Sequence, residues 1–168
     1  YVNDVTALRA APQMAALVAE RGATCCLMHM RGEPRTMQDD VRYDDVVSEV
    51  KAFLEERVAF ALAEGIPEER IHLDPGIGFG KGVDANLELL RRLDELAALG
   101  FPLVIGTSRK SFIGRLTGAS EPRDRVPGTL ATCVMALERG GRIFRVHDVR
   151  EAAQALTVAA ATLRADGA

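Results

Sequence analysis

The stretch of sequence that decides the fold lies between residues 71 and 81 and reads Ile71-His72-Leu73-Asp74-Pro75-Gly76-Ile77-Gly78-Phe79-Gly80-Lys81. A short apolar run ends in one carboxylate, and a proline stops it before a glycine-rich turn. Because proline cannot continue a central strand and glycine permits backbone shapes that other residues avoid, we expect Asp74 at the C-terminal tip of a buried strand. In parallel α/β proteins, ligands bind at such tips.

Outward from this stretch, five strand-like runs alternate with helical patterns. The predicted strands cover Tyr1–Val5, Thr24–Met30, Arg70–Leu73, Pro102–Gly106 and Ile143–His147. The predicted helices cover about Pro12–Arg21, Val41–Glu64, Asn86–Ala98, Gly128–Arg139 and Arg150–Leu163. These predictions rest on apolar residues at helical spacing and on glycines that end helices.

This alternation predicts an α/β protein with right-handed crossovers and a parallel sheet, in one domain that covers residues 1–168. Two architectures have five such units. One is a small doubly wound sheet, and the other is the last five units of a (β/α)8 TIM barrel, which needs eight units and about 250 residues. We favour the partial barrel, because the chain starts inside a strand.

The composition is that of an ordinary globular protein, with 48% hydrophobic and 27% charged residues. A net charge of −3 gives no reason to expect nucleic acid, and no apolar run is long enough for a membrane helix. Cys25, Cys26 and Cys133 lack metal-ligand spacing, so we expect buried thiols of a reducing compartment. For His29 and His72 we expect packed or hydrogen-bonded roles.

The glycine-rich turn does not match either familiar phosphate loop. A dinucleotide loop requires glycine where Lys81 stands, and a Walker A loop requires glycine at Pro75 and Ser or Thr at Gly82. The turn is therefore not a nucleotide loop. Taken alone, the loop favours a tight turn with a surface lysine, although Asp74 at the strand tip weakens that interpretation.

Polar residues follow other predicted strands as well. Asn3 offers both a donor and an acceptor to the edge of a heterocycle, although it could also be a turn residue. Lys110 stands among hydroxyl and basic residues after the fourth strand, which indicates an anion or carbonyl site or else a solvated basic turn.

Arg145 and His147 are two residues apart on the fifth predicted strand, so their side chains should face the same way. Burying both inside a barrel is costly unless they bind a charged group. Arginine offers a planar fork for phosphate oxygens, and histidine adds a donor. The alternative is a structural ion pair with Asp148 or another acid.

Together these motifs resemble dihydropteroate synthase over nearly the whole chain and in the family's order. The resemblance is carried by Val2–Val5, Leu27–Gly32, Leu73–Lys81, Gly106–Ser111 and Arg145–Val149. It implies a TIM barrel, and a reaction that joins 6-hydroxymethyl-7,8-dihydropterin pyrophosphate to 4-aminobenzoate, giving dihydropteroate and pyrophosphate in folate biosynthesis.

The resemblance also implies the roles of individual residues. Asp74 would bind the amino and ring N–H edge of the pterin, with Asn3 beside it and Lys110 on the carbonyl edge. Met28 and Gly106 would line the ring's faces, and Arg145 and His147 would hold the pyrophosphate. The 4-aminobenzoate site, where sulfonamides compete, would be bordered by Phe79 and Ser111. The catalytic residues would be Asp74, Lys110, Arg145 and His147.

The resemblance further implies Mg²⁺, although none of its protein ligands lies in this chain. The family's first three strands, which carry that ligand, have no counterpart in these 168 residues. We therefore expect this chain alone to be inactive or weak. The partners would be the two small-molecule substrates, with no nucleic acid and no membrane, in a possible cytoplasmic homodimer.

Two other functions stay open at this point. A pterin-binding corrinoid methyltransferase shares the barrel and a pterin-facing aspartate, but methyl transfer expels no pyrophosphate for Arg145 and His147 to hold. The second alternative is a non-catalytic pterin-binding fragment, which would bind the pterin without turnover.

Overall fold

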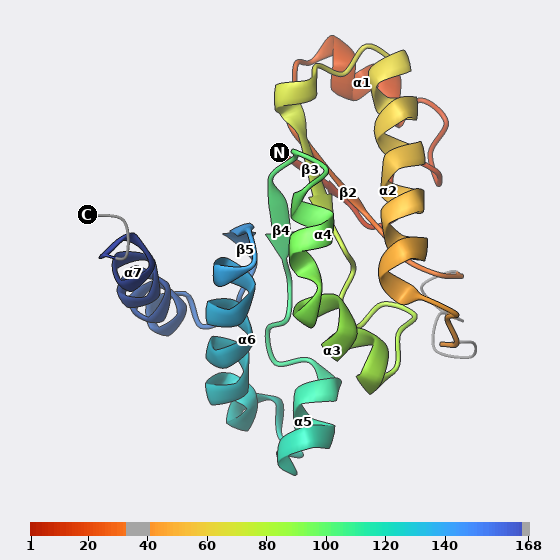
Figure 1. The fold of residues 1–168 in the computed structure, drawn as a ribbon. Helices are drawn as coiled ribbons and strands as arrows, with labels where there is room; N and C mark the ends of the chain where they lie inside the picture. Colours follow the sequence, from red (N-terminus) through yellow and green to blue (C-terminus); the bar gives the residue numbers. More distant parts are fainter. Residues whose placement is uncertain (33–40, 166–168) are drawn as a thin grey trace.

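The computed structural model describes residues 1–32 and 41–165 and contains one five-stranded parallel sheet (Figure 1). Each strand pairs with the next one along the chain. The strands are β1 Val2–Asp4, β2 Cys25–Met28, β3 Ile71–Asp74, β4 Leu103–Ile105 and β5 Gly141–Phe144.

The order of the strands decides between the two predicted architectures. The order β1-β2-β3-β4-β5 never reverses, whereas a doubly wound sheet reverses at its switch point. Right-handed crossovers that always advance in the same direction place every helix on the same face of the sheet. The chain is therefore an arc of a barrel, as predicted, and β1 and β5 are its two edges.

Helices cover one face of this arc, except that the last one packs against the helix before it and lies beside the sheet (Figure 1), and their bounds agree broadly with the predicted ranges. They are α1 Met14–Glu20, α2 Val46–Ala63, α3 Val83–Arg91, α4 Leu93–Ala97, α5 Ser111–Thr117, α6 Val126–Glu138 and α7 Val149–Ala165, with 3-10 turns at Glu68–Arg70 and Pro122–Arg125. None of them, within the described ranges, has the length and hydropathy to cross a membrane.

Two helix boundaries differ from the prediction for identifiable reasons. Helix α2 begins at Val46 rather than Val41, because the side chain of Asp45 accepts hydrogen bonds from the backbone N–H groups of Val47 and Ser48 and caps the helix there. The single helix predicted for Asn86–Ala98 is two helices, because the backbone of Arg92 leaves helical geometry at φ −111° and ψ 30°.

The stretch after Lys110, for which the sequence patterns predicted no helix, forms the short helix α5. It ends at Gly118, whose φ of 77° is the left-handed conformation that commonly terminates helices. The prediction missed this helix because seven residues present too few apolar positions to show a period.

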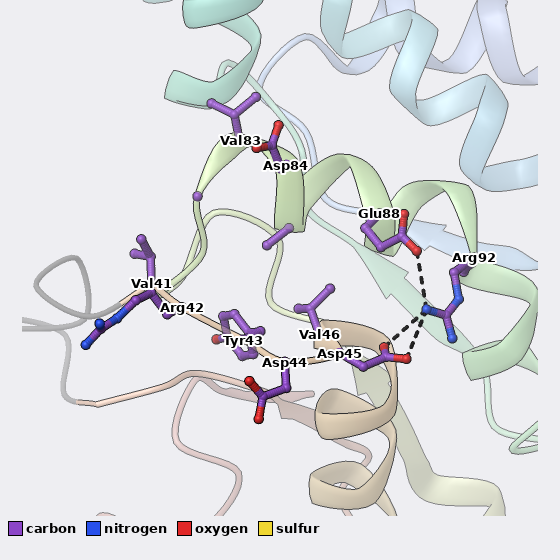
Figure 2. A pocket seen from close by; sticks show the side chains of 12 residues that line it. Val41, Arg42, Tyr43, Asp44, Asp45, Val46, Val83, Asp84, Glu88 and Arg92 are labelled. Carbon is purple, nitrogen blue, oxygen red and sulfur yellow. Dashed lines mark hydrogen bonds and ion pairs between the residues drawn. The ribbon is translucent and has the colours of Figure 1, made fainter.

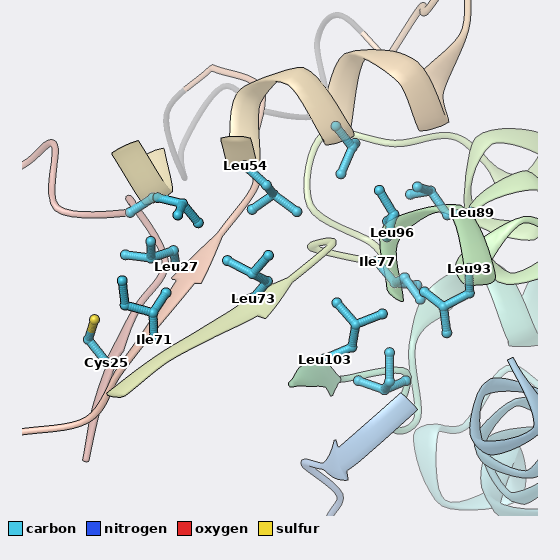
Figure 3. Packing of buried hydrophobic residues seen from close by; sticks show 14 of the residues in the cluster. Cys25, Leu27, Leu54, Ile71, Leu73, Ile77, Leu89, Leu93, Leu96 and Leu103 are labelled. Carbon is cyan, nitrogen blue, oxygen red and sulfur yellow. The ribbon is translucent and has the colours of Figure 1, made fainter. Parts of the chain in front are cut away.

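The hydrophobic core lies between the sheet and the helices (Figure 3). Alternate strand residues such as Leu27, Leu73 and Leu103 enter this core and pack with Leu54 and Leu93. Because side chains alternate along a strand, Met28 and Asp74 lie on the opposite face, away from the helices. That face carries the predicted site.

Candidate active site

Asp74 is the last residue of β3 and is only 4% exposed. Its Oδ1 accepts a hydrogen bond of 2.7 Å from the backbone N–H of Gly76. Burial raises the pKa of Asp74, while the Gly76 N–H and the cations of Lys110, Lys81 and Arg145 act in the opposite direction. The site is thus built around one buried carboxyl group facing several cations.

The glycine loop after Asp74 packs closely against the backbone at the end of β2. Gly76, Gly78 and Gly80 all have positive φ angles, of 66°, 83° and 65°. A Cβ at Gly76 would lie 1.8 Å from the carbonyl oxygen of His29, so no larger residue fits there. Lys81 is 3% exposed, so the interpretation of the loop as a turn with a surface lysine is wrong.

Lys110 lies across this loop. Its Nζ donates to the carbonyl oxygen of Ile77 and lies 4.6 Å from the centroid of the Phe79 ring. A Cβ at Gly78 would come within 2.8 Å of the Lys110 side chain. Burial lowers the pKa of Lys110 to about 8, with Asp74 opposing the shift and Arg145 adding to it. Lys110 therefore lies between the Phe79 ring and the buried carboxyl group of Asp74 in its electrostatic contacts.

A second part of the site lies at the ends of β4 and β5. A cavity of about 160 Å³ is lined by Gly106, Ser108, Lys110, Arg145, Val146 and His147. Gly106 is the place where the two cations meet, because a Cβ there would lie 3.9 Å from both Arg145 Nη2 and Lys110 Nζ. The concentration of positive charge and N–H donors suits an anion.

Ser108 orients the imidazole of His147. Its Oγ lies 2.8 Å from His147 Nδ1 and accepts a 3.0 Å hydrogen bond from the backbone N–H of His147. The serine hydroxyl can donate to Nδ1, and in the tautomer that accepts this hydrogen bond the ring proton lies on Nε2. Nε2–H is then available to a ligand in the cavity.

In this region the predicted extent of the fifth strand was wrong, and so was the alternative of an ion pair with Asp148. Strand β5 ends at Phe144, so Arg145 and His147 follow it rather than lie within it, although the N–H of Arg145 still donates to the carbonyl oxygen of Ile105. Asp148 does not pair with either of them. Its carboxylate binds the guanidinium of Arg109 through two hydrogen bonds of 3.0 Å and 2.5 Å.

The remaining predicted site residues lie around Asp74 at different positions along the strands. Met28 ends β2 directly opposite Asp74 and is buried. Asn3 is exposed on β1, opposite Cys26, which is two residues short of the level of Asp74. Ser111 is exposed at the start of α5, next to Lys110.

The two other histidines have the roles predicted for them. His29 is buried against the edge of the Phe53 ring and accepts at Nδ1 from Lys81 Nζ, at 2.9 Å. His72 Nδ1 lies 2.9 Å from the hydroxyl group of Tyr1. The three cysteines are buried thiols, as expected.

The sequence alone did not identify three features of the site. They are the Ser108–His147 pair, the Arg109–Asp148 ion pair and the burial of Lys81. The two pairs each join residues that are 39 positions apart in the chain. The burial of Lys81 depends on contacts with distant residues such as His29. The only hint was the crowding of polar residues directly after a strand.

A separate cavity of about 620 Å³ lies elsewhere. It is formed by Val41–Val46 and by the first turns of α3, next to an ion pair of Arg92 with Asp45 and Glu88 (Figure 2). None of the predicted site residues lines it. Its connection to the Asp74 loop is a 2.8 Å hydrogen bond from the Tyr43 hydroxyl to the carbonyl oxygen of Gly80.

Comparison with known proteins gives consistent results. Dihydropteroate synthase of Synechocystis sp. is 46% identical over 163 residues, which is 97% of this chain and 56% of that protein. The structure of dihydropteroate synthase from Thermus thermophilus in complex with 6HMPPP superposes with a TM-score of 0.89 at 50% identity, over 95% of this chain and 62% of that chain. The Xanthomonas albilineans dihydropteroate synthase with 4-aminobenzoic acid gives 0.89 at 45% identity, over 96% of this chain and 56% of that one.

The chain thus spans a little more than half the length of the curated relatives that it matches. Residues 1–147 match the family described as pterin binding enzyme. These residues include every predicted site residue, from Asn3 to His147. The chain belongs to the pterin binding enzyme family.

Proposed function

We propose that this chain supplies the pterin and diphosphate sites of a dihydropteroate synthase. The reaction would join 6-hydroxymethyl-7,8-dihydropterin pyrophosphate to 4-aminobenzoate. The observation that carries the proposal is the placement of one buried carboxyl group, Asp74, beside Lys110 and the anion cavity of Arg145 and His147. A substrate with a donor-rich ring at one end and a diphosphate at the other fits this arrangement.

The ring end of the substrate would bind at Asp74. A carboxylate accepts two parallel hydrogen bonds, which matches the amino group and adjacent ring N–H of a pterin. Lys110 would donate to the ring carbonyl, and Met28 would pack on the ring face. Asn3 would bind the ring from β1.

The diphosphate end would bind in the cavity beside Gly106. Arg145 would supply the planar guanidinium fork, and His147 would donate from Nε2 because Ser108 occupies Nδ1. This anion site favours the synthase over a corrinoid methyltransferase, because methyl transfer expels no pyrophosphate.

In the reaction, the C–O bond between the pterin methylene and the pyrophosphate breaks, and the leaving pyrophosphate takes the electron pair. The amine nitrogen of 4-aminobenzoate then bonds to the methylene carbon and loses one proton. Arg145, His147 and Lys110 would stabilise the charge on the leaving group, and Asp74 would hold the cationic pterin in line. Phe79 and Ser111 would border the 4-aminobenzoate.

Magnesium is part of this proposal only through the family resemblance. Within residues 1–32 and 41–165, no three His, Cys, Asp or Glu side chains gather to hold a metal ion. No step above uses the ion. We place its protein ligand outside this chain.

We also propose a cytoplasmic setting and a homodimer. The first is supported by the buried, unbridged thiols of Cys25, Cys26 and Cys133. The second is supported by apolar side chains exposed on α7, such as Val158 and Leu163. Sedimentation of the purified chain would test the dimer.

The decisive experiment replaces Arg145 with alanine. Calorimetry should show that Arg145→Ala weakens binding of the pyrophosphorylated pterin by at least about tenfold, while binding of 6-hydroxymethylpterin is unchanged. Arg142→Ala, at an exposed position on β5 three residues before Arg145, is the matched control. Equal affinity of the wild type and Arg145→Ala for the pyrophosphorylated pterin would refute the diphosphate site.

A further inference from the structure

Lys81 is a buried cation that the proposed reaction does not use. It follows the glycine loop and is 3% exposed. Burying an ammonium group is costly unless each of its N–H groups finds an acceptor. The contacts of its Nζ therefore indicate what the residue does.

Four acceptors surround the Nζ of Lys81, and the carbonyl oxygen of His29, at 3.5 Å, is the most distant of them. The carbonyl oxygens of Gly76 and Phe79 each lie at 3.0 Å, and the Nδ1 of His29 lies at 2.9 Å. An ammonium has three N–H donors, so this set satisfies it completely. The two carbonyl groups come from the loop, and His29 comes from the segment that follows β2.

The histidine is suited to accept. Burial lowers the pKa of His29 to about 3, with Lys81, Arg31 and Arg9 acting in the same direction. The ring is therefore neutral, and its Nδ1 carries a lone pair. The edge contact with Phe53, at 4.9 Å and 88°, fixes its orientation.

From this geometry we infer that Lys81 is a positioning residue, whose ammonium group holds the loop of residues 76–80 in the shape that places Phe79 and the Gly76 N–H at the site. Without the cation, the carbonyl groups of Gly76 and Phe79 would lose their shared donor. The same loop delivers the N–H that binds Asp74 and the aromatic ring that faces Lys110. Lys81 thus binds the loop through its carbonyl oxygens, whereas Lys110 lies on the side of the loop where the ligand would bind.

Other contacts of the loop explain why the effect of Lys81 should be local. Asn86 Oδ1 accepts from the N–H of Gly78, and the Tyr43 hydroxyl donates to Gly80. These contacts hold the far end of the loop to α3 and to the segment before α2. Lys81 instead binds the carbonyl oxygens of Gly76 and Phe79, on either side of Gly78.

The test is amide hydrogen exchange of the chain at pH 6, where Lys81 is an ammonium because burial lowers its pKa only to about 7. In Lys81→Met, the amides of Gly76 and Phe79 should exchange at least about tenfold faster than in the wild type. The amide of Leu73, which donates to Pro102 in the sheet, should change by less than about threefold. The matched control is Lys51→Met on α2, which should change none of these amides.

Equal acceleration at Leu73 and in the loop, or no acceleration in the loop, would overturn the inference. If Lys81→Met does not fold, Lys81→Gln serves instead, since it keeps two N–H donors on a shorter side chain and should show a smaller acceleration at the same amides.

A second arm rests on the proposed function. Pteroate should bind the wild type more tightly than 6-hydroxymethylpterin, and Lys81→Met should lose most of that difference, because Phe79 no longer borders the aromatic end. A wild type that binds neither compound would count against the proposed function alone, since the exchange arm uses no ligand. An unchanged pteroate preference in Lys81→Met would count against Lys81 as a positioning residue.

Discussion

Asp74 is the residue from which the rest of the site can be understood. Its position was predictable, because an apolar run, a carboxylate and a proline form a local pattern that any parallel strand end would share. Its surroundings were not predictable, because Gly76, Lys110 and Arg145 approach it from three different segments. The chemistry of Asp74 is therefore set by residues that the local pattern does not contain.

Replacing Asp74 with asparagine should weaken pterin binding more than it affects folding. We expect Asp74→Asn to bind 6-hydroxymethylpterin with an affinity lower by about 2 kcal/mol, because an amide cannot accept from two adjacent donors as a carboxylate does. Thermal unfolding should change little, because burial already disfavours the charged form. Calorimetry and circular dichroism measure the two effects, with Asp124→Asn as the exposed control. A pterin affinity equal to that of the wild type would argue against the assigned role.

His29 should make the chain sensitive to acid. Its pKa is about 3 in the folded chain and near 6.5 when unfolded, so between these values the unfolded chain binds more protons. Stability should therefore fall as the pH drops below 6.5, by about 3 kcal/mol at pH 4 from this residue. Lys81, whose pKa is about 7 in the folded chain, is protonated in both states well below that pH and adds little slope there.

The variant that tests this is His29→Gln, which keeps an acceptor for Lys81 but does not titrate. Urea unfolding between pH 7 and pH 4 should show a smaller loss of stability for the variant than for the wild type. Parallel pH profiles would mean that His29 is protonated in the folded chain at pH 4.

At the level of helices and strands, the sequence predicted the order of the elements but not all their ends. Strand β5 ends before Arg145, and the predicted helix 86–98 is interrupted at Arg92. The interruption coincides with a tertiary contact. Arg92 is held by Asp45 of the segment before α2, and such a contact has no signature within the helix itself.

The ion pair between Arg109 and Asp148 connects the segment after β4 to the segment after β5. The neighbouring residues Ser108 and His147 form a further contact between these segments. Arg109 also has a positive φ of 56°, which is uncommon for a residue with a side chain. The pair therefore holds the two halves of the anion cavity together.

Breaking this ion pair should reduce anion binding. We expect Asp148→Asn to weaken binding of inorganic pyrophosphate by about tenfold, because small displacements of binding groups are costly. Calorimetry measures this, and Glu138→Gln, which breaks the exposed pair with Arg139, serves as the control. The exchanged pair Arg109→Asp with Asp148→Arg should recover part of the loss. If Asp148→Asn binds pyrophosphate as the wild type does, the ion pair has no role in shaping the cavity.

Across the molecule as a whole, β1 and β5 each have one neighbouring strand within the five-stranded sheet. A strand edge leaves backbone N–H and C=O groups without sheet partners. On the face opposite the core, Asn3 is exposed although the proposal assigns it to the pterin. The 168-residue chain therefore presents an incomplete barrel interior.

We accordingly expect the purified 168-residue chain to form dihydropteroate very slowly or not at all, and to unfold at a low temperature. A coupled assay for pyrophosphate release and a calorimetric scan would measure both quantities. Turnover comparable to that of a full-length relative, with no added protein, would contradict this expectation.

Patterns along the chain were enough to establish the class of fold, the succession of strands and helices along the chain, and the position of Asp74 at a strand tip, because these depend on a few neighbouring residues. They also excluded a nucleotide-binding role for the glycine loop, since the required glycines are absent. The burial of Lys81 beside His29, the orientation of His147 by Ser108 and the pairing of Arg109 with Asp148 came from the three-dimensional structure. These partners lie 39 to 52 residues apart, and the spacing of residues along a chain carries no information about which side chains meet when strands are brought side by side.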